Sequence, residues 1–218
     1  MIITRQKPFS DILKGLEGKE KIFLFGCGLC ATTCKTGGEK DLAAMEKLLA
    51  REDKKVTGWI VLEPSCSLLE IKRAYRDKKA EIAFSDAILS MSCGGGTQAI
   101  AEIIEDKDIL PSNNTLFQGE ISKMTLREAR FEQKCSLCGE CALAETETIC
   151  PVTQCPKSLV NGPCGGVKQG KCETDRERDC VWIRIYERLK KKGRIDNLRK
   201  RKEPPDHGAN KNPRSLSI

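Results

Sequence analysis

The chain has 218 residues, of which 39% are hydrophobic and only 5% aromatic, and its formal net charge at pH 7 is +7. This length accommodates one ordinary domain or two small ones with a mainly aliphatic core. The first residues lack the apolar run of a signal peptide, and no stretch reaches the roughly 18 apolar residues of a membrane span. We therefore expect a cytoplasmic protein without a membrane span.

The net positive charge comes from the end of the chain. Residues 190–218 contain ten Lys or Arg and three Asp or Glu, which leaves 28 of each kind in the first 189 residues. We expect residues 199–218 to form a basic, flexible tail, with docking on the acidic surface of a partner as the alternative. The neutral body and the lack of an aromatic-rich RNA motif argue against a nucleic-acid partner.

The first half of the sequence alternates between strand and helix patterns. We predict strands at 21–25, at 56–62 and within 83–91, and helices at 39–51, 67–78 and 96–105. Such alternation predicts parallel strands joined by helical crossovers. The expected fold class is α/β, with a small Rossmann-like or flavodoxin-like parallel half-sheet over residues 1–110.

The second half is expected to be irregular. Residues 111–134 are typical of a connector, with a turn at Pro111–Asn114 and a helix from Met124 to Gln133. A cysteine-rich metal-binding domain follows at 135–198. Its C-terminal helix has one predicted apolar face, made of Val181, Trp182, Ile185, Tyr186 and Leu189.

Thirteen cysteines are the most informative feature of the chain. A reducing cytoplasm and an odd number of cysteines argue against a disulfide framework. One isolated cysteine can be a small buried hydrophobe, but three within seven residues indicate metal ligation. The candidate metal ligands are Cys27, Cys30, Cys34, Cys66, Cys93, Cys135, Cys138, Cys141, Cys150, Cys155, Cys164, Cys172 and Cys180.

Five of these cysteines are predicted to gather at one edge of the sheet. Cys27, Cys66 and Cys93 follow the first, second and third predicted strands, and Cys30 and Cys34 extend the set. The carboxyl ends of parallel strands meet at the edge where open α/β sheets bind ligands. These five thiols are therefore a candidate metal or thiol site.

The other eight cysteines divide into two sets of four. The run Cys135-x2-Cys138-x2-Cys141 has the spacing of bacterial ferredoxins, in which a Cys-Pro follows. Two Cys-Pro pairs occur here, Cys150-Pro151 and Cys155-Pro156, and order alone does not assign the fourth ligand. The simplest division places Cys150 with this run as an iron–sulfur site, with structural zinc as the alternative. The second set is Cys155, Cys164, Cys172 and Cys180. Its seven-residue gaps leave an iron–sulfur cluster and an all-cysteine zinc site open, since the single histidine, His207, lies in the tail.

No arrangement of a nucleophile with a base is visible in the sequence. With one tail histidine, an ordinary catalytic triad is excluded. We therefore expect no catalytic residue and no residue binding an organic cofactor in this chain.

Three segments resemble a known family. The segment that runs from Cys155-Pro156 through Asn161-Gly162-Pro163-Cys164-Gly165-Gly166 to Lys190 is similar to the C-terminal domain of methylenetetrahydrofolate reductases. Gly26-Cys27-Gly28-Leu29-Cys30 and Ser92-Cys93-Gly94-Gly95-Gly96 resemble the small iron–sulfur subunit of the two-subunit reductases of acetogenic bacteria. Together the resemblance covers most of residues 20–198.

This resemblance implies a subunit of an oxidoreductase. The chain would pass electrons to the flavin of a partner subunit, which reduces 5,10-methylenetetrahydrofolate to 5-methyltetrahydrofolate in the methyl branch of the Wood–Ljungdahl pathway. The implied cofactors are one or more 4Fe–4S clusters, with zinc as a further candidate and flavin only in the partner. The implied partners are that catalytic subunit and further redox subunits or a ferredoxin. The alternative is a zinc-stabilised scaffold or adaptor of the same complex that transfers no electrons.

Overall fold

A computed structural model describes residues 1–125, 128–203, 208 and 212–217. The chain forms two compact units, Met1–Phe117 with Ile121–Phe131, and Gln118–Glu120 with Glu132–Ile218. Within the described residues, no helix has the length and apolar composition needed to cross a bilayer. Part of the predicted tail, residues 204–207, 209–211 and 218, lies outside the described residues.

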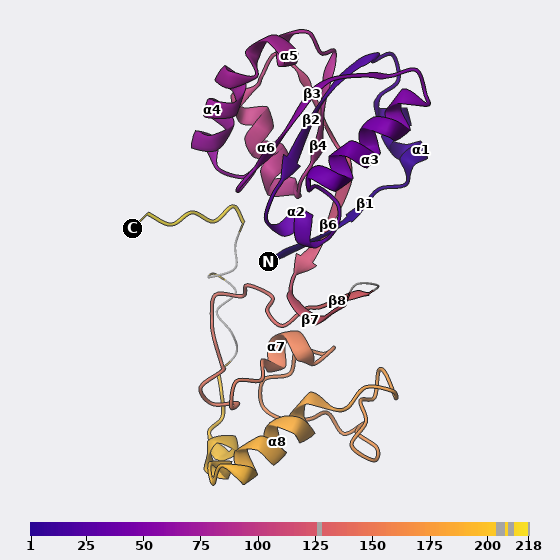
Figure 1. The fold of residues 1–218 in the computed structure, drawn as a ribbon. Coiled ribbons are helices and arrows are strands. Elements are labelled where there is room, and N and C mark those ends of the chain that lie inside the picture. Colours follow the sequence, from indigo (N-terminus) through magenta and orange to yellow (C-terminus); the bar gives the residue numbers. More distant parts are fainter. Residues whose placement is uncertain (126–127, 204–207, 209–211, 218) are drawn as a thin grey trace. The chain divides into compact units, whose positions relative to one another are not determined.

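The first unit is built around a parallel sheet with the strand order β3-β2-β4-β5 (Figure 1). Its α/β class is the predicted one. A separate pair joins β1 to β6. The elements are β1 (Ile2–Gln6), α1 (Phe9–Gly15), β2 (Lys21–Cys27), α2 (Cys30–Thr33), α3 (Glu39–Ala50), β3 (Lys55–Leu62), α4 (Leu68–Asp77), α5 (Lys79–Ala83), β4 (Ala87–Met91), α6 (Gly94–Ile103), β5 (Asp108–Pro111) and β6 (Asn113–Gln118).

Alternate residues of the central strand β2 serve two separate cores. Ile22 and Leu24 pack with residues of α1 and α3, while Phe23 and Phe25 pack with residues of α4, α5 and α6. Side chains of a strand point alternately to the two faces, so a strand that is apolar at every position requires helices on both sides. Figure 1 shows α1 and α3 on one face of the sheet and α4 to α6 on the other.

Residues 108–134 differ from the prediction. The turn expected at Pro111–Asn114 is wrong, because β5 continues almost directly into β6, and Ser112 donates its N–H to the Ser90 carbonyl at 2.9 Å. The helix expected from Met124 to Gln133 is also wrong. A hairpin of β7 (Glu120–Met124) and β8 (Ala129–Glu132) occupies this region. The few apolar side chains here cannot bury a helix face, and an unsupported short helix is marginal in water.

The second unit has little regular structure. It contains the one-turn helix α7 (Pro151–Gln154), the helix α8 (Val181–Lys191) and the 3₁₀ helix η1 (Ile195–Arg199). The predicted apolar face of α8 is confirmed at Val181, Trp182, Ile185 and Leu189, which are buried. The prediction is wrong for Tyr186, whose side chain is 40% exposed. The buried core consists of Ile149, Cys180, Val181, Trp182, Ile185 and Leu189. So small a core calls for an additional stabilising element such as a bound metal.

Candidate metal centres

The sheet of the first unit positions cysteines at the carboxyl ends of three adjacent strands. Cys27 is the last residue of β2, Cys66 lies between β3 and α4, and Cys93 precedes α6 as its N-cap. Because β3, β2 and β4 are parallel neighbours, these three positions share one edge. Cys30 begins the short helix α2, and Cys34 follows its end. The edge predicted from the sequence is therefore present.

The Cys27 sulfur lies in a small nest of hydrogen-bond donors. Burial raises the pKa of the Cys27 thiol, but hydrogen bonds from the Ser65 side chain and from the backbone at Ser65, Leu29 and Ala31 outweigh it and lower that pKa. Donors around a sulfur favour the thiolate, which is the form that binds a metal. Ser65 was not singled out from the sequence, although it directly precedes Cys66.

Four sulfurs at this edge act on one another electrostatically. Burial raises the pKa of the Cys66 thiol, and the negative charges of Cys93, Cys27 and Cys30 raise it further. Like charges raise a pKa when they are close in space. The structure thus places Cys27, Cys66 and Cys93 at one sheet edge, and whether the five thiols bind a metal there stays a prediction.

Glycines allow the loops of this edge to approach closely. A Cβ at Gly37 would lie 2.0 Å from the Met91 carbonyl oxygen, and a Cβ at Gly96 would lie 2.5 Å from the Ser65 hydroxyl. No larger residue fits either position without movement of a neighbour. The loop after β2 is thereby packed against the end of β4, and the start of α6 against the residue that binds the Cys27 sulfur.

In the second unit, the Cys135 run is linked to the Cys150 segment. The Ser136 and Thr153 hydroxyls lie 2.8 Å apart, and the Leu137 N–H donates to the Cys135 sulfur at 3.3 Å. Cys150 is the N-cap of α7, with Pro151 in the first turn. Backbone N–H donors beside cysteine sulfurs are among the contacts that tune iron–sulfur clusters. The Cys141 side chain is exposed.

The second set of four cysteines lines one small cavity. Cys155, Cys164, Cys172 and Cys180 all border it, together with Pro163, Val167 and Trp182, and its volume is about 20 Å³. About 10–15 Å³ on this measure holds one water molecule. The four thiols of this set therefore border one small shared cavity, and their chemistry fits both an all-cysteine zinc site and an iron–sulfur cluster.

Polar side chains surround this cavity. The Cys164 thiol donates to a Glu173 carboxylate oxygen at 3.1 Å, and Lys157 pairs with the same oxygen at 2.5 Å. The hydrogen bond from Lys157 is the main cause that lowers the pKa of Glu173. The sequence search missed both residues, although each directly follows a cysteine or a Cys-Pro.

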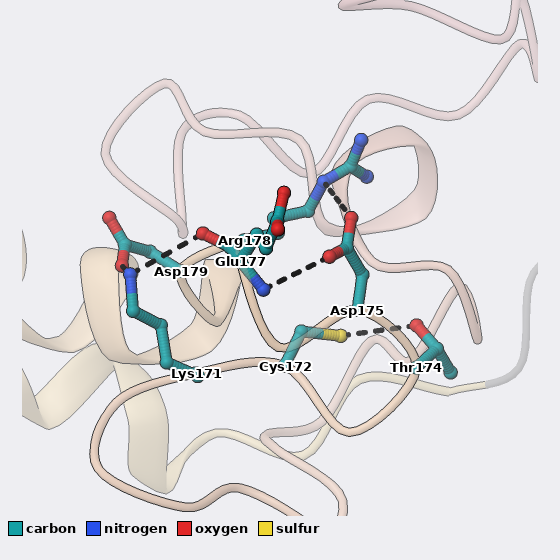
Figure 2. Close-up of polar contacts among 7 residues, drawn as sticks. All are labelled: Lys171, Cys172, Thr174, Asp175, Glu177, Arg178 and Asp179. Carbon is teal, nitrogen blue, oxygen red and sulfur yellow. Dashed lines mark hydrogen bonds and ion pairs between the residues drawn. The ribbon is translucent and has the colours of Figure 1, made fainter.

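Cys172 lies in a tight polar loop (Figure 2). Its sulfur is 3.3 Å from the Thr174 hydroxyl, and that hydrogen bond is the main cause that lowers the pKa of the Cys172 thiol. The loop is held by ion pairs of Lys171 with Asp179 at 2.7 Å and of Arg178 with Asp175 at 3.9 Å. The loop therefore orients one prospective thiolate toward the cavity that Cys172 lines.

In the described part of the chain, no three Cys, His, Asp or Glu side chains lie close enough together to hold one metal ion. The donor chemistry nevertheless fits soft metal centres, because zinc and iron–sulfur clusters both take cysteine thiolates. The thirteen thiols are free cysteines rather than disulfides.

A second, larger cavity lies beside α8. It has a volume of about 770 Å³, with Trp182, Ile183 and Tyr186 on one side and residues 199–202 on another. The Asn161 side chain fixes this basic segment, since it accepts from the Lys202 N–H at 2.7 Å and donates to the Lys202 carbonyl at 2.8 Å. The described start of the predicted tail is thus attached to its own unit.

Comparison with known proteins identifies the second half of the chain. No curated protein matches the sequence. The crystal structure of arylmalonate decarboxylase matches with a TM-score of 0.34 and 22% identity, over 47% of this chain and 44% of that protein, so the chain spans less than half of its length. Residues 110–208 match the family described as methylene-tetrahydrofolate reductase C terminal. This segment, which contains the eight cysteines from Cys135 to Cys180, is therefore related to methylenetetrahydrofolate reductases.

Proposed function

We propose that the chain is the iron–sulfur subunit of a methylenetetrahydrofolate reductase and that it passes electrons to the flavin of a separate catalytic subunit. The match of residues 110–208 to the reductase C-terminal family is the observation that carries this proposal. The described residues contain no barrel of the kind that holds a flavin and a folate, and in this proposal the partner supplies both.

The electron-transferring site is assigned to Cys135, Cys138, Cys141 and Cys150. Their spacing is that of ferredoxins, and the Ser136–Thr153 contact links the run to the Cys150 segment. A 4Fe–4S cluster bound there would supply single electrons. Reduction of a methylene to a methyl group consumes two electrons and two protons, so this chain would serve the partner twice per turnover.

The second set, Cys155, Cys164, Cys172 and Cys180, is assigned to zinc. All four thiols border one small cavity, and four cysteine thiolates are a ligand set of structural zinc. Such an ion would hold together the loops around α8, in a unit whose main buried cluster, among the described residues, has six members. In this arrangement the second set stabilises the unit, as the alternative scaffold function requires, and the set from Cys135 to Cys150 transfers electrons.

Metal analysis and electron transfer test the proposal together. Anaerobically purified protein should be brown, and Cys138→Ser should remove about four iron and four sulfide per chain without removing zinc. The same variant should slow reduction of the partner flavin at least tenfold in a stopped-flow experiment with the purified flavoprotein subunit. Leu143→Ala, an exposed change in the same unit, is the matched control and should alter neither quantity.

The outcomes separate the two functions. Colourless protein that contains only zinc, or unchanged flavin reduction by Cys138→Ser, would refute electron transfer. If the flavoprotein instead lost stability or assembly with other redox subunits when this chain was omitted, the zinc-stabilised scaffold would be the function.

A further inference from the structure

The large cavity beside α8 has no cysteine among its described lining residues, so it belongs to neither cysteine set of the second unit. Its volume of about 770 Å³ falls within the range of small-molecule sites, which is about 300–1,000 Å³. Such sites combine apolar or aromatic walls with a few fixed polar groups that orient the ligand. This cavity has both kinds of wall.

Helix α8 supplies the aromatic wall. Trp182, Ile183 and Tyr186 line the cavity, and residues three or four apart on a helix are neighbours on its surface. The Trp182 ring is held in place, since its indole N–H donates to the Leu159 carbonyl at 3.0 Å. Tyr186 belongs to the apolar pattern of the helix and yet is 40% exposed. Its ring therefore offers aromatic area that no core residue covers.

A second wall of the cavity is basic. It consists of Arg199, Lys200, Arg201 and Lys202, with Glu145 as the one acidic residue in the lining. Arg199 pairs with Asp196 at 3.2 Å, and Lys202 pairs with Glu140 at 3.7 Å. Among the described residues, Lys200 and Arg201 have no ion-pair partner, and both side chains are exposed. Two positive charges at the cavity are thus left uncompensated by the described residues.

Hydrogen bonds fix the basic wall at both ends. At one end Asn161 accepts from the Lys202 N–H at 2.7 Å and donates to the Lys202 carbonyl at 2.8 Å. At the other end the Asn197 side chain donates to the Glu145 carbonyl at 3.4 Å. Binding groups that are ordered in advance lose less conformational entropy when a ligand binds.

We propose that this cavity binds a nucleoside phosphate, with its base against Tyr186 and Trp182 and its phosphates on Lys200 and Arg201. A nucleobase is a flat aromatic ring, and stacking on an aromatic side chain does not require a particular base. Arginine and lysine bind phosphate oxygens through charge-assisted hydrogen bonds. The binding is non-covalent and does not depend on the proposed electron transfer.

Equilibrium dialysis of the intact, anaerobically purified chain tests the proposal with three probes. Adenosine diphosphate, which has both the ring and the phosphates, should bind saturably at about one molecule per chain. Adenosine carries only the ring, and pyrophosphate carries only the charge. Each of these two should bind at least about tenfold more weakly than adenosine diphosphate, because it uses only one of the two walls.

Single variants with matched controls locate the site. Tyr186→Leu should weaken the binding of adenosine diphosphate about tenfold, whereas Phe84→Leu, the same change at an exposed aromatic residue of the first unit, should leave it unchanged. Lys200→Gln and Arg201→Gln should each weaken it at least about fivefold. Lys191→Gln removes an equal charge from the exposed end of α8, outside the cavity lining, and should have no effect.

Four results would overturn the proposal. They are the lack of saturable binding of adenosine diphosphate, pyrophosphate binding as tight as that of adenosine diphosphate, unchanged affinity in Tyr186→Leu, and equal losses in Lys191→Gln and Arg201→Gln. The second and the fourth would reveal general attraction of anions to a basic surface. Dialysis involves no flavin reduction, and Cys138→Ser should retain the binding, so failure of this site is distinguishable from failure of the proposed function.

Discussion

Substitution of Gly37 by alanine should destabilise the first unit and open its thiol edge. Gly37 is buried, and a Cβ there would lie 2.0 Å from the Met91 carbonyl oxygen and 2.7 Å from the Ala31 Cβ. Real Cβ contacts are essentially never shorter than 3.0 Å, so the backbone after β2 must move away from β4 by about 1 Å. Overpacking of this kind costs about 1–3 kcal/mol of folding free energy.

The movement also has a consequence for the metal site. Gly37 accepts a hydrogen bond from the Cys27 N–H at 2.9 Å, and Met91 lies two residues before Cys93. Displacing one loop from the other therefore separates two of the proposed ligands. We expect Gly37→Ala to lose any metal held by Cys27 and Cys93, in addition to stability.

The assay is chemical unfolding of the anaerobic protein with parallel metal analysis. Gly15→Ala is the matched control, because it makes the same change in helix α1, where the nearest atom to the new Cβ is 3.9 Å away. That control should be neutral or more stable by about 0.5–1 kcal/mol. Equal unfolding midpoints and equal metal contents for the two variants would refute the packing argument.

Further predictions concern the second unit and the proposed function. Ile185 is fully buried, so Ile185→Ala should cost about 2–5 kcal/mol in denaturant unfolding, whereas Ile195→Ala, at a position 37% exposed, should change stability by about 0.5 kcal/mol or less. Glu147 pairs with Lys192 and Arg194, each at 2.8 Å, and the hydrogen bond from Lys192 is the main cause that lowers its pKa. The stabilisation from the ion pairs of Glu147 is complete above the ordinary glutamate pKa, and it is lost as the pH falls through the lowered pKa of Glu147. The stability difference between wild type and Glu147→Gln, measured by thermal unfolding, should therefore shrink below about pH 4, and a constant difference from pH 7 to 3 would contradict this. The iron loss of Cys138→Ser, described above, completes the set.

The sequence patterns predicted the parallel sheet because both faces of its strands must be covered. Every residue of Ile22–Phe25 is apolar and fully buried, and Leu42, Met45 and Leu49 repeat at helical spacing on one buried face. Patterns of this kind depend on burial alone and can be recognised locally. The strands β1, β6 and β8 could not be predicted in this way, since they are short and mixed in polarity, and they exist only because a distant or facing segment pairs with them.

The cysteines show the same division between local and tertiary information. Spacing along the chain was enough to place Cys135, Cys138 and Cys141 in one set, because residues three apart lie close in any compact loop. Sequence order was also enough to put Cys27, Cys66 and Cys93 on one sheet edge, since parallel neighbours end together.

Only the tertiary structure distinguishes the surroundings of neighbouring thiols. Cys30 and Cys34 cannot be distinguished by spacing, and they differ because Ile2, a residue of a strand from the start of the chain, presents its N–H to one and its carbonyl to the other. Likewise, only folding brings Ser65 to the Cys27 sulfur and leaves a space of about 20 Å³ among the four thiols of the second set. Sequence determines which residues can ligate a metal, whereas the directions of donors and the size of the enclosed space arise from packing between segments that are distant in the chain.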